Sequence, residues 1–291
     1  MKKVVILGCE NSHADLFLQF MAEKPEFAGI EVAGVYSEER ETAEKLRQRF
    51  GVPVMDNYDE AVGKVDGVIV TARHGDRHYT YAKPYLQTGV SLFVDKPVAI
   101  REEDALAMLA QTSQKGVKVT GGSCLRYATS VAEAKQAHIA AEGGRTVSGV
   151  VRAPLNCDVR YGGFYFYAQH VVDMVMEIFG HHPEAVQVST DQNGVRTVIF
   201  KYEDFNAVGV YTEGSSEYYA VRFGVNGAQG GQVTGQQLGD CFYTEFKKFY
   251  DLLFGGQMTE SYEALFAPVF VMNAIDRATS TGKIETIQYG K

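Results

Sequence analysis

Apolar and polar positions in the first part of the chain alternate between short apolar runs and segments with helical spacing. The pattern predicts strands at 4–7, 30–36, 65–71, 91–94 and 117–120, with a short extended piece at 52–55. It predicts helices at 14–22, 38–50, 58–62, 79–87 and 104–114. Because strands and helices alternate this regularly, we expect parallel strands joined by right-handed crossovers, hence a doubly wound sheet.

The pattern changes after about residue 125. Helical spacing at 131–142 and 169–179 brackets a strand at 147–153, and helices at 243–254 and 262–281 close the chain. Four further strands follow one another without helices, at 185–189, 195–201, 206–212 and 218–225. Such a succession favours an antiparallel sheet, and the glycine-rich stretch 224–239 is interpreted as loops or turns. We therefore predict a Rossmann-like domain over 1–124 and an α+β domain over 125–291.

Composition limits the classes of protein to consider. A length of 291 residues suggests two domains, and 45% hydrophobic with 22% charged residues is ordinary for a globular protein. The net charge of −8, without a long basic run, argues against nucleic acid or a membrane as partner. The first residues are typical of a strand rather than a signal peptide, and the four cysteines lack metal or disulfide spacing. We expect a cytoplasmic protein that binds no metal.

One stretch, SLFVDKPVAI over 91–100, has the form of a buried strand that ends in an acid, a lysine and a proline. Pro97 disfavours helical geometry at Lys96 and thus presents its ammonium where the strand stops. Ligands bind at the carboxyl ends of strands in open α/β sheets. Lys96 could there hold a substrate hydroxyl and stabilise the oxyanion that forms as hydride leaves. The alternative is a surface lysine in a tight turn.

The turn after the first strand is irregular for a dinucleotide site. In the usual fingerprint G-x-G-x-x-G, counted from Gly8, the second and third glycines are replaced by Glu10 and His13. A carboxylate at Glu10 opposes a phosphate unless it turns away. Asn11 and Ser12 can still cap the next helix, whose N-terminal N–H groups can bind an anion. The alternative is a strand-to-helix turn without a ligand.

The end of the second strand bears on the choice between NAD and NADP. An acid there binds the ribose 2′-hydroxyl of NAD, whereas a nearby arginine accommodates the 2′-phosphate of NADP. Ser37 stands where the acid is expected, and Arg40 lies one turn away. This tilts the prediction slightly toward NADP, although Glu38 and Glu39 oppose it. A solvated helix start with acids suited to the helix dipole is the alternative.

Several segments occur in an order that resembles a known family. They are VDGVIVTARHGDRH, GVSLFVDKPVA, GGSCLRY and GGFYFYAQHVVDMV, followed by FYTEFKKFYDLLFGG and AIDRATSTGK. Together they resemble the glucose-fructose oxidoreductase and inositol dehydrogenase family, Gfo/Idh/MocA, over nearly the whole chain. The most specific element is the Glu/Asp-Lys-Pro motif, here Asp95-Lys96-Pro97. The resemblance implies a dinucleotide-binding domain, a domain on an open antiparallel sheet that commonly mediates oligomers (here a dimer or tetramer), and a substrate between the domains.

The family's second motif, Asp-x-x-x-His on a helix, is half present. Its histidine is His170, which can exchange a hydroxyl proton near neutral pH, but Phe166 stands where the acid is expected. Asp173 could orient His170 or be an unrelated helix residue. Tyr165 and Tyr167 could line a cleft and bind substrate hydroxyls, and the alternative is aromatic packing.

The resemblance adds further candidates. Arg126 matches an arginine that touches substrate or bridges domains, and His78 matches a histidine of the loop before a helix. Thr71 and Asp95 are expected beside the cofactor with Lys96. His181 and His182 lack partners at metal spacing, so no metal site is expected.

These observations support an oxidoreductase that uses NAD or NADP on a small hydroxylated substrate such as a sugar or inositol, with Lys96 and His170 as catalytic groups. A second hypothesis is a non-catalytic ligand-binding or regulatory protein, motivated by Glu10, His13 and Phe166 together. A third keeps a tightly held cofactor for net non-redox chemistry.

Overall fold

The computed structural model describes residues 1–87 and 89–290, which form two compact units. The first unit comprises Met1–Gly122 and Tyr243–Leu265, and the second comprises Ser123–Phe242 and the residues from 266 onward. This division begins close to the boundary predicted at 124/125. It differs from the prediction in that residues 243–265 group with the first unit.

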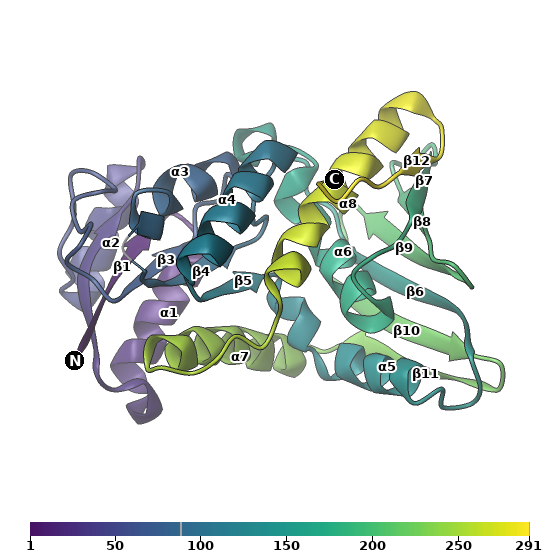
Figure 1. Cartoon of the computed structure of the whole chain (residues 1–291), viewed down its shortest axis with the longest axis horizontal. Helices are drawn as coiled ribbons and strands as arrows, with labels where there is room; N and C mark the ends of the chain where they lie inside the picture. Colours follow the sequence, from purple (N-terminus) through teal and green to yellow (C-terminus); the bar gives the residue numbers. More distant parts are fainter. Residues whose placement is uncertain (88, 291) are drawn as a thin grey trace. The chain divides into compact units, whose positions relative to one another are not determined.

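The first unit is built on a five-stranded parallel sheet in the order β2-β1-β3-β4-β5 (Figure 1). Its strands are β1 (Lys2–Leu7), β2 (Ile30–Tyr36), β3 (Gly67–Val70), β4 (Ser91–Asp95) and β5 (Val119–Gly122). Its crossover helices are α1 (Ser12–Glu23), α2 (Arg40–Phe50), α3 (Asp76–Ala82) and α4 (Glu102–Lys115), with short 3-10 turns at Pro25–Phe27 and Tyr85–Gln87. Leu7 pairs with both Tyr36 and Val70, so the carboxyl ends of these strands meet at one edge. The predicted doubly wound sheet is confirmed.

Aromatic side chains fill the core of this unit. Phe17 of α1 lies with its ring centroid 5.2 Å from that of Phe93 in β4 and 4.9 Å from that of Phe246. Phe246 belongs to α7 (Gly235–Leu253), and all three side chains are fully buried. Burial of such rings is a large favourable contribution to folding. The burial of Phe246 against Phe17 explains why residues 243–253 pack in the first unit, although they are far in sequence from the rest of that unit.

The second unit is built on a seven-stranded sheet in the order β11-β10-β6-β9-β8-β7-β12 (Figure 1). The strands are β6 (Thr146–Pro154), β7 (Ala185–Thr190), β8 (Arg196–Lys201), β9 (Asn206–Thr212), β10 (Tyr218–Gly224), β11 (Gly227–Val233) and β12 (Glu285–Thr286). All neighbours are antiparallel except β6 and β9, so the sheet is mixed but mostly antiparallel, as predicted. The helices are α5 (Thr129–Ile139), α6 (Tyr165–Phe179) and α8 (Tyr262–Thr281), with 3-10 turns at Cys124–Tyr127 and Val159–Tyr161.

Two local predictions were wrong. Residues 58–62 form turns rather than a helix. The stretch 224–239, expected to be loops, contains strand β11 and the start of α7. A side chain at Gly230 would bring a Cβ 2.1 Å from the carbonyl oxygen of Ala220 in β10, and φ there is +99°. The glycine that indicated a loop instead permits close strand pairing.

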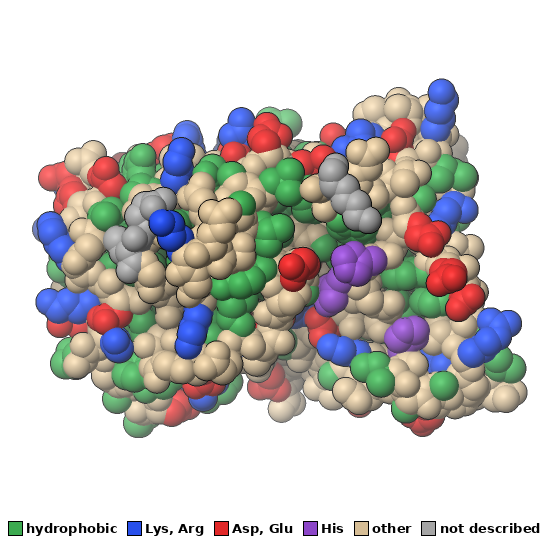
Figure 2. Space-filling model, viewed as in Figure 1, with side chains coloured by type: hydrophobic (Ala, Val, Ile, Leu, Met, Phe, Trp, Pro, Cys, Tyr) green, Lys and Arg blue, Asp and Glu red, His purple; other side chains and the backbone are tan. Residues whose placement is uncertain are grey.

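Charge on the visible surface is mixed. Lys and Arg side chains are interspersed with Asp and Glu side chains over the face that Figure 2 shows. Among residues 1–87 and 89–290, no helix is both long and apolar enough to cross a membrane.

Candidate functional site

The turn after β1 lies at the carboxyl edge of the first unit's sheet. Gly8 has φ +79°, and a Cβ there would lie 2.4 Å from backbone atoms of Ala72, so the turn fits only glycine. The Thr71 hydroxyl donates to the Gly8 carbonyl at 3.1 Å. Asn11 is the N-cap of α1, and its side chain accepts from the His13 N–H at 3.3 Å. The structure thus brings together the predicted Gly8, Asn11, Thr71 and, as the first residue of α1, Ser12.

Glu10, at the position of the second glycine, turns its carboxylate toward the ends of β2 and β3. Its Oε2 accepts from the Ser37 hydroxyl at 2.8 Å, and its Oε1 accepts from the Arg73 backbone N–H at 3.0 Å. Ser37, in turn, accepts from the Glu39 N–H at 3.0 Å. A carboxylate fixed by two donors has one defined position at the sheet edge.

Arg40 lies exposed at the start of α2. Its guanidinium pairs with Asp56 at 2.7 Å and approaches Glu44 at 3.8 Å. The hydrogen bond from Arg40 to Asp56 raises the arginine pKa further above its usual value. Arg40 is thus paired with neighbouring acids, and the Ser37 hydroxyl donates to the Glu10 carboxylate.

Asp95 is the last residue of β4 and Lys96 follows it directly, and both are buried. The Asp95 carboxylate accepts from the Asn11 amide at 3.0 Å and from the Lys96 backbone N–H at 2.7 Å, and it lies 2.6 Å from His13 Nδ1. Burial acts to raise the pKa of Asp95, but the charges of His13 and Lys96 outweigh it and lower that pKa. The peptide bond between Lys96 and Pro97 is cis. His13, which stands in place of the third glycine of the dinucleotide fingerprint, therefore contacts Asp95 of the Asp95-Lys96-Pro97 motif directly.

A further acid, Glu245, reaches this cluster from α7. It is 1% exposed, and its Oε1 lies 3.9 Å from His13 Nδ1. Burial, and then the nearby charge of Asp95, raise the pKa of Glu245 well above its usual value. Sequence reasoning missed Glu245 because a single acid in an amphipathic helix carries no motif.

We expect Glu245→Gln to flatten the dependence of stability on pH. The folded-state pKa exceeds the unfolded value, so the native protein loses stability as pH rises from about 4.3 through the raised pKa. A glutamine has no proton to lose, so the variant should gain melting temperature relative to the parent between pH 5 and pH 8. Thermal unfolding at both pH values measures this, with exposed Glu263→Gln as control. An identical shift at both pH values would contradict the raised pKa of Glu245.

His78 lies fully buried in α3. Its Nε2 lies 2.7 Å from the carbonyl oxygen of Ala72, and burial lowers the pKa of the imidazole. A neutral imidazole in hydrogen-bonding contact with that carbonyl fastens α3 to the loop after β3. His78 thereby supports the edge that carries Thr71.

In the second unit, His170 on α6 contacts Ser123. The Ser123 Oγ lies 2.7 Å from His170 Nδ1, and the Ser123 N–H donates to Asp173 at 2.7 Å. Gln169 also donates to Asp173, at 3.1 Å. Asp173 therefore acts on His170 through Ser123, which sequence reasoning missed although it lies within GGSCLRY. The ring of Tyr167 packs edge-on to His170 at 5.2 Å.

Arg126 is buried beside Asp173. Its guanidinium lies 3.8 Å from the Asp173 carboxylate and 3.9 Å from that of Glu177. Burial raises the pKa of Asp173, and the charge of Arg126 offsets part of that shift. Tyr165, by contrast, directs its hydroxyl to Asn273 at 3.2 Å and Asp276 at 3.3 Å on α8. Lys96 lies in the first unit and His170 in the second.

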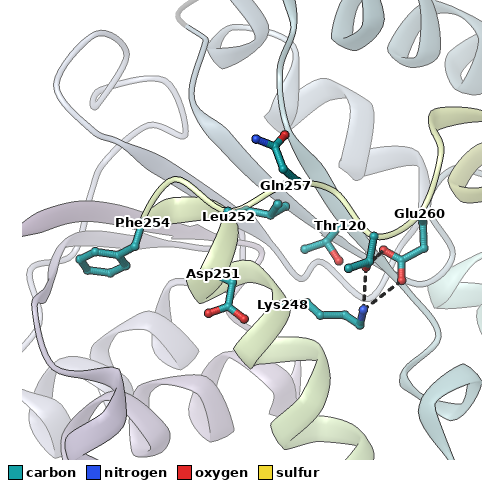
Figure 3. Close-up of a pocket in the computed structure, with 9 residues that line it drawn as sticks. Thr120, Lys248, Asp251, Leu252, Phe254, Gln257 and Glu260 are labelled. Carbon is teal, nitrogen blue, oxygen red and sulfur yellow. Dashed lines mark hydrogen bonds and ion pairs between the residues drawn. The ribbon is translucent and has the colours of Figure 1, made fainter.

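A cavity of about 450 Å³ in the first unit contains none of the predicted site residues among its lining. Figure 3 shows Lys248 of α7 directed toward Glu260, from which its ammonium lies 3.3 Å away. Lys248 also donates to the Thr259 hydroxyl at 2.6 Å. Thr120 of β5 and Leu252 of α7 also line it. The lysine is thus engaged by the loop that follows α7.

Comparison with known proteins places this geometry in context. Residues 2–123 match the model of an oxidoreductase family with an NAD-binding Rossmann fold, GFO_IDH_MocA. The myo-inositol 2-dehydrogenase of Lactobacillus plantarum superposes with a TM-score of 0.84 at 14% identity, over 99% of both chains. GenD2 from gentamicin A biosynthesis, solved with NAD, gives 0.83 at 18% identity over 99% of this chain and 96% of that one. At these identities the structures show a common fold.

Two bacterial relatives match part of the chain. YceM of Salmonella typhimurium, assigned as an oxidoreductase, is 29% identical over 108 residues, which are 37% of this chain and 35% of the relative. The uncharacterized oxidoreductase YhhX of Escherichia coli is 27% identical over 135 residues, 42% of this chain and 38% of the relative. The chain therefore spans little more than a third of these relatives in the alignments.

Proposed function

We propose that the chain, whose residues 2–123 match the model of the Gfo/Idh/MocA oxidoreductase family, transfers a hydride between NAD(P) and a small hydroxylated compound. A sugar, an inositol or a derivative fits, and the structural likeness to a myo-inositol 2-dehydrogenase supports that class. The observation that carries the proposal is Lys96, a buried cation at the carboxyl end of β4, held beside a buried carboxylate. Ligands of open α/β sheets bind at this edge.

The residues at the edge fit a dinucleotide. Gly8 keeps the tight turn, and the N-terminus of α1 begins directly behind it. The Glu10 carboxylate, which would oppose a phosphate, is instead held by Ser37 and Arg73. Gly8, Asn11 and Ser12 would hold the pyrophosphate. The rest of the dinucleotide would be supported by Ser37, by Thr71 and by the sheet edge around Asp95 and His78. When bound, the nicotinamide accepts or returns the hydride.

Each catalytic group has a stated role. The Lys96 Nζ would donate to the reacting hydroxyl oxygen and stabilise the negative charge that develops on that oxygen as its proton is removed, before the hydride leaves the adjacent carbon for the nicotinamide. His170 would take the hydroxyl proton as the carbonyl forms, with its ring orientation fixed by Ser123 at Nδ1. Arg126, Tyr167 and Asp173 would shape and support the substrate side, whereas Tyr165 is held by α8.

Titration with NADH and NADPH, followed by nicotinamide fluorescence and thermal stability, tests the cofactor part. We expect saturable binding of at least one cofactor together with a raised melting temperature. A screen of polyols with the oxidised form of that cofactor should then give reduced cofactor with some substrate. Failure of both cofactors to bind at millimolar concentration would overturn the proposal.

A second function, ligand binding without catalysis, is favoured by one observation. Glu10 and His13 replace glycines of the dinucleotide loop, and both are committed to protein contacts. Under this hypothesis a polyol would bind without cofactor turnover. Net non-redox chemistry on a retained cofactor would be recognised by product analysis without net cofactor reduction.

A homo-oligomer through the second unit's sheet also stays a proposal. Val150, Val208 and Val221 are half-buried neighbours on adjacent strands of that sheet. Such an apolar strip suits a dimer or tetramer contact, which light scattering would test.

A further inference from the structure

We propose that Glu10 selects NAD over NADP by supplying, from the turn after β1, the carboxylate that the end of β2 lacks. The inference rests on the proposed function, because it requires a dinucleotide at this edge. An acid at the end of the second strand accepts a hydrogen bond from the ribose 2′-hydroxyl of NAD. Here that position is Ser37, the first residue after β2, and its hydroxyl binds the Glu10 carboxylate at 2.8 Å.

The position of Glu10 is fixed from two strands. Ser37 follows β2 and the Arg73 N–H follows β3, and each donates to a different carboxylate oxygen. In the sheet β1 lies between β2 and β3, so the strand order reverses at β1. The Glu10 carboxylate, which follows β1, therefore binds donors that follow both neighbouring strands. A carboxylate oxygen has two lone pairs, so each oxygen can accept a ribose hydroxyl besides its present donor.

Two arginines near this edge are paired with acids. Arg40, on which the sequence-based preference for NADP depended, binds Asp56 at 2.7 Å. Arg77 binds Glu38 at 3.0 Å. A 2′-phosphate, with a charge of about −1.5 to −2, would meet the Glu10 carboxylate where NAD presents a hydroxyl. Like charges brought together in this way oppose binding, so the arrangement favours NAD.

Equilibrium titration of the full chain with NADH and with NADPH, followed by nicotinamide fluorescence, tests the inference. The parent protein should bind NADH at least about tenfold more tightly than NADPH. Glu10→Gln keeps the shape and removes the charge, so the ratio of the two Kd values should fall toward one, chiefly through a gain in NADPH affinity. Glu41→Gln, a matched loss of an exposed acid at the start of α2, should leave the ratio unchanged.

Three results would overturn the inference. The first is a parent protein that prefers NADPH, which would mean that Arg73 or Arg77 serves a 2′-phosphate. The second is an unchanged ratio in Glu10→Gln with the fold intact by circular dichroism. The third is a Glu10→Gly variant that gains affinity for both cofactors equally, which would make Glu10 an obstruction to the pyrophosphate. If neither NADH nor NADPH binds to the parent protein, to Glu10→Gln or to Glu10→Gly, the proposed function itself is wrong.

Discussion

Lys96→Met is expected to lower turnover by about two to three orders of magnitude, with little change in the Kd of the bound cofactor. Removal of one preorganised donor to a developing oxyanion has a cost of this size. The strand end does not depend on the lysine side chain, since the backbone N–H of Lys96 donates to Asp95 at 2.7 Å. Methionine has a similar length and lacks the charge, so the edge should keep its shape. Steady-state kinetics with the identified substrate and cofactor titration measure the two quantities separately.

Lys45→Met is the matched control for this prediction. Lys45 is exposed on α2 in the same unit, so the same chemical change there should leave both turnover and cofactor affinity within about twofold. Turnover of Lys96→Met within a few-fold of the parent would remove Lys96 from the mechanism. A joint loss of turnover and melting temperature would show that the buried ammonium supports the fold instead.

The parallel half of the fold follows from local patterns. Strands such as β1 and β4 are apolar runs because both faces of the sheet are covered, and the helices between them have apolar side chains at helical spacing. The return of residues 243–265 to this unit could not be predicted in the same way. It depends on the burial of Phe246 against Phe17, a contact between residues 229 positions apart that no local pattern encodes.

The candidate site was predictable where a motif carried it. Lys96 and His170 occur in segments with recognisable residues around them, and the structure buries both. The partners of these residues were not predictable, because they are chosen by packing. His13 was a departure from a glycine pattern and proved to bind Asp95, Glu245 carried no signal, and Ser123 proved to join His170 to Asp173.

A common arrangement links the two proposed catalytic groups. In the first unit, buried Asp95 accepts from the backbone N–H of Lys96. In the second unit, buried Asp173 accepts from the backbone N–H of Ser123, whose side chain contacts His170. In each case a desolvated carboxylate fixes a short backbone segment, and that segment positions the reacting group. Such support restricts a functional side chain more tightly than packing alone.

Asp173→Leu should cost about 3–5 kcal/mol of unfolding free energy, because it leaves the buried Arg126 guanidinium without this carboxylate and the Ser123 N–H without its acceptor. The melting temperature should fall by roughly 10 °C, as measured by thermal unfolding with denaturant titration alongside. Asp204→Ala, at an exposed turn of the same unit, should change stability by less than about 0.5 kcal/mol.

The double variant Arg126→Met/Asp173→Leu separates the loss of the charge pair from the loss of packing. Two apolar side chains of similar length leave no isolated buried charge, so the double variant should be more stable than Asp173→Leu alone. Its Ser123 N–H still lacks an acceptor, so recovery should be incomplete, and the His170 ring should remain less well fixed. If the double variant is as unstable as the sum of the two single variants, Arg126 and Asp173 act independently, and the 3.8 Å contact contributes nothing to the second unit.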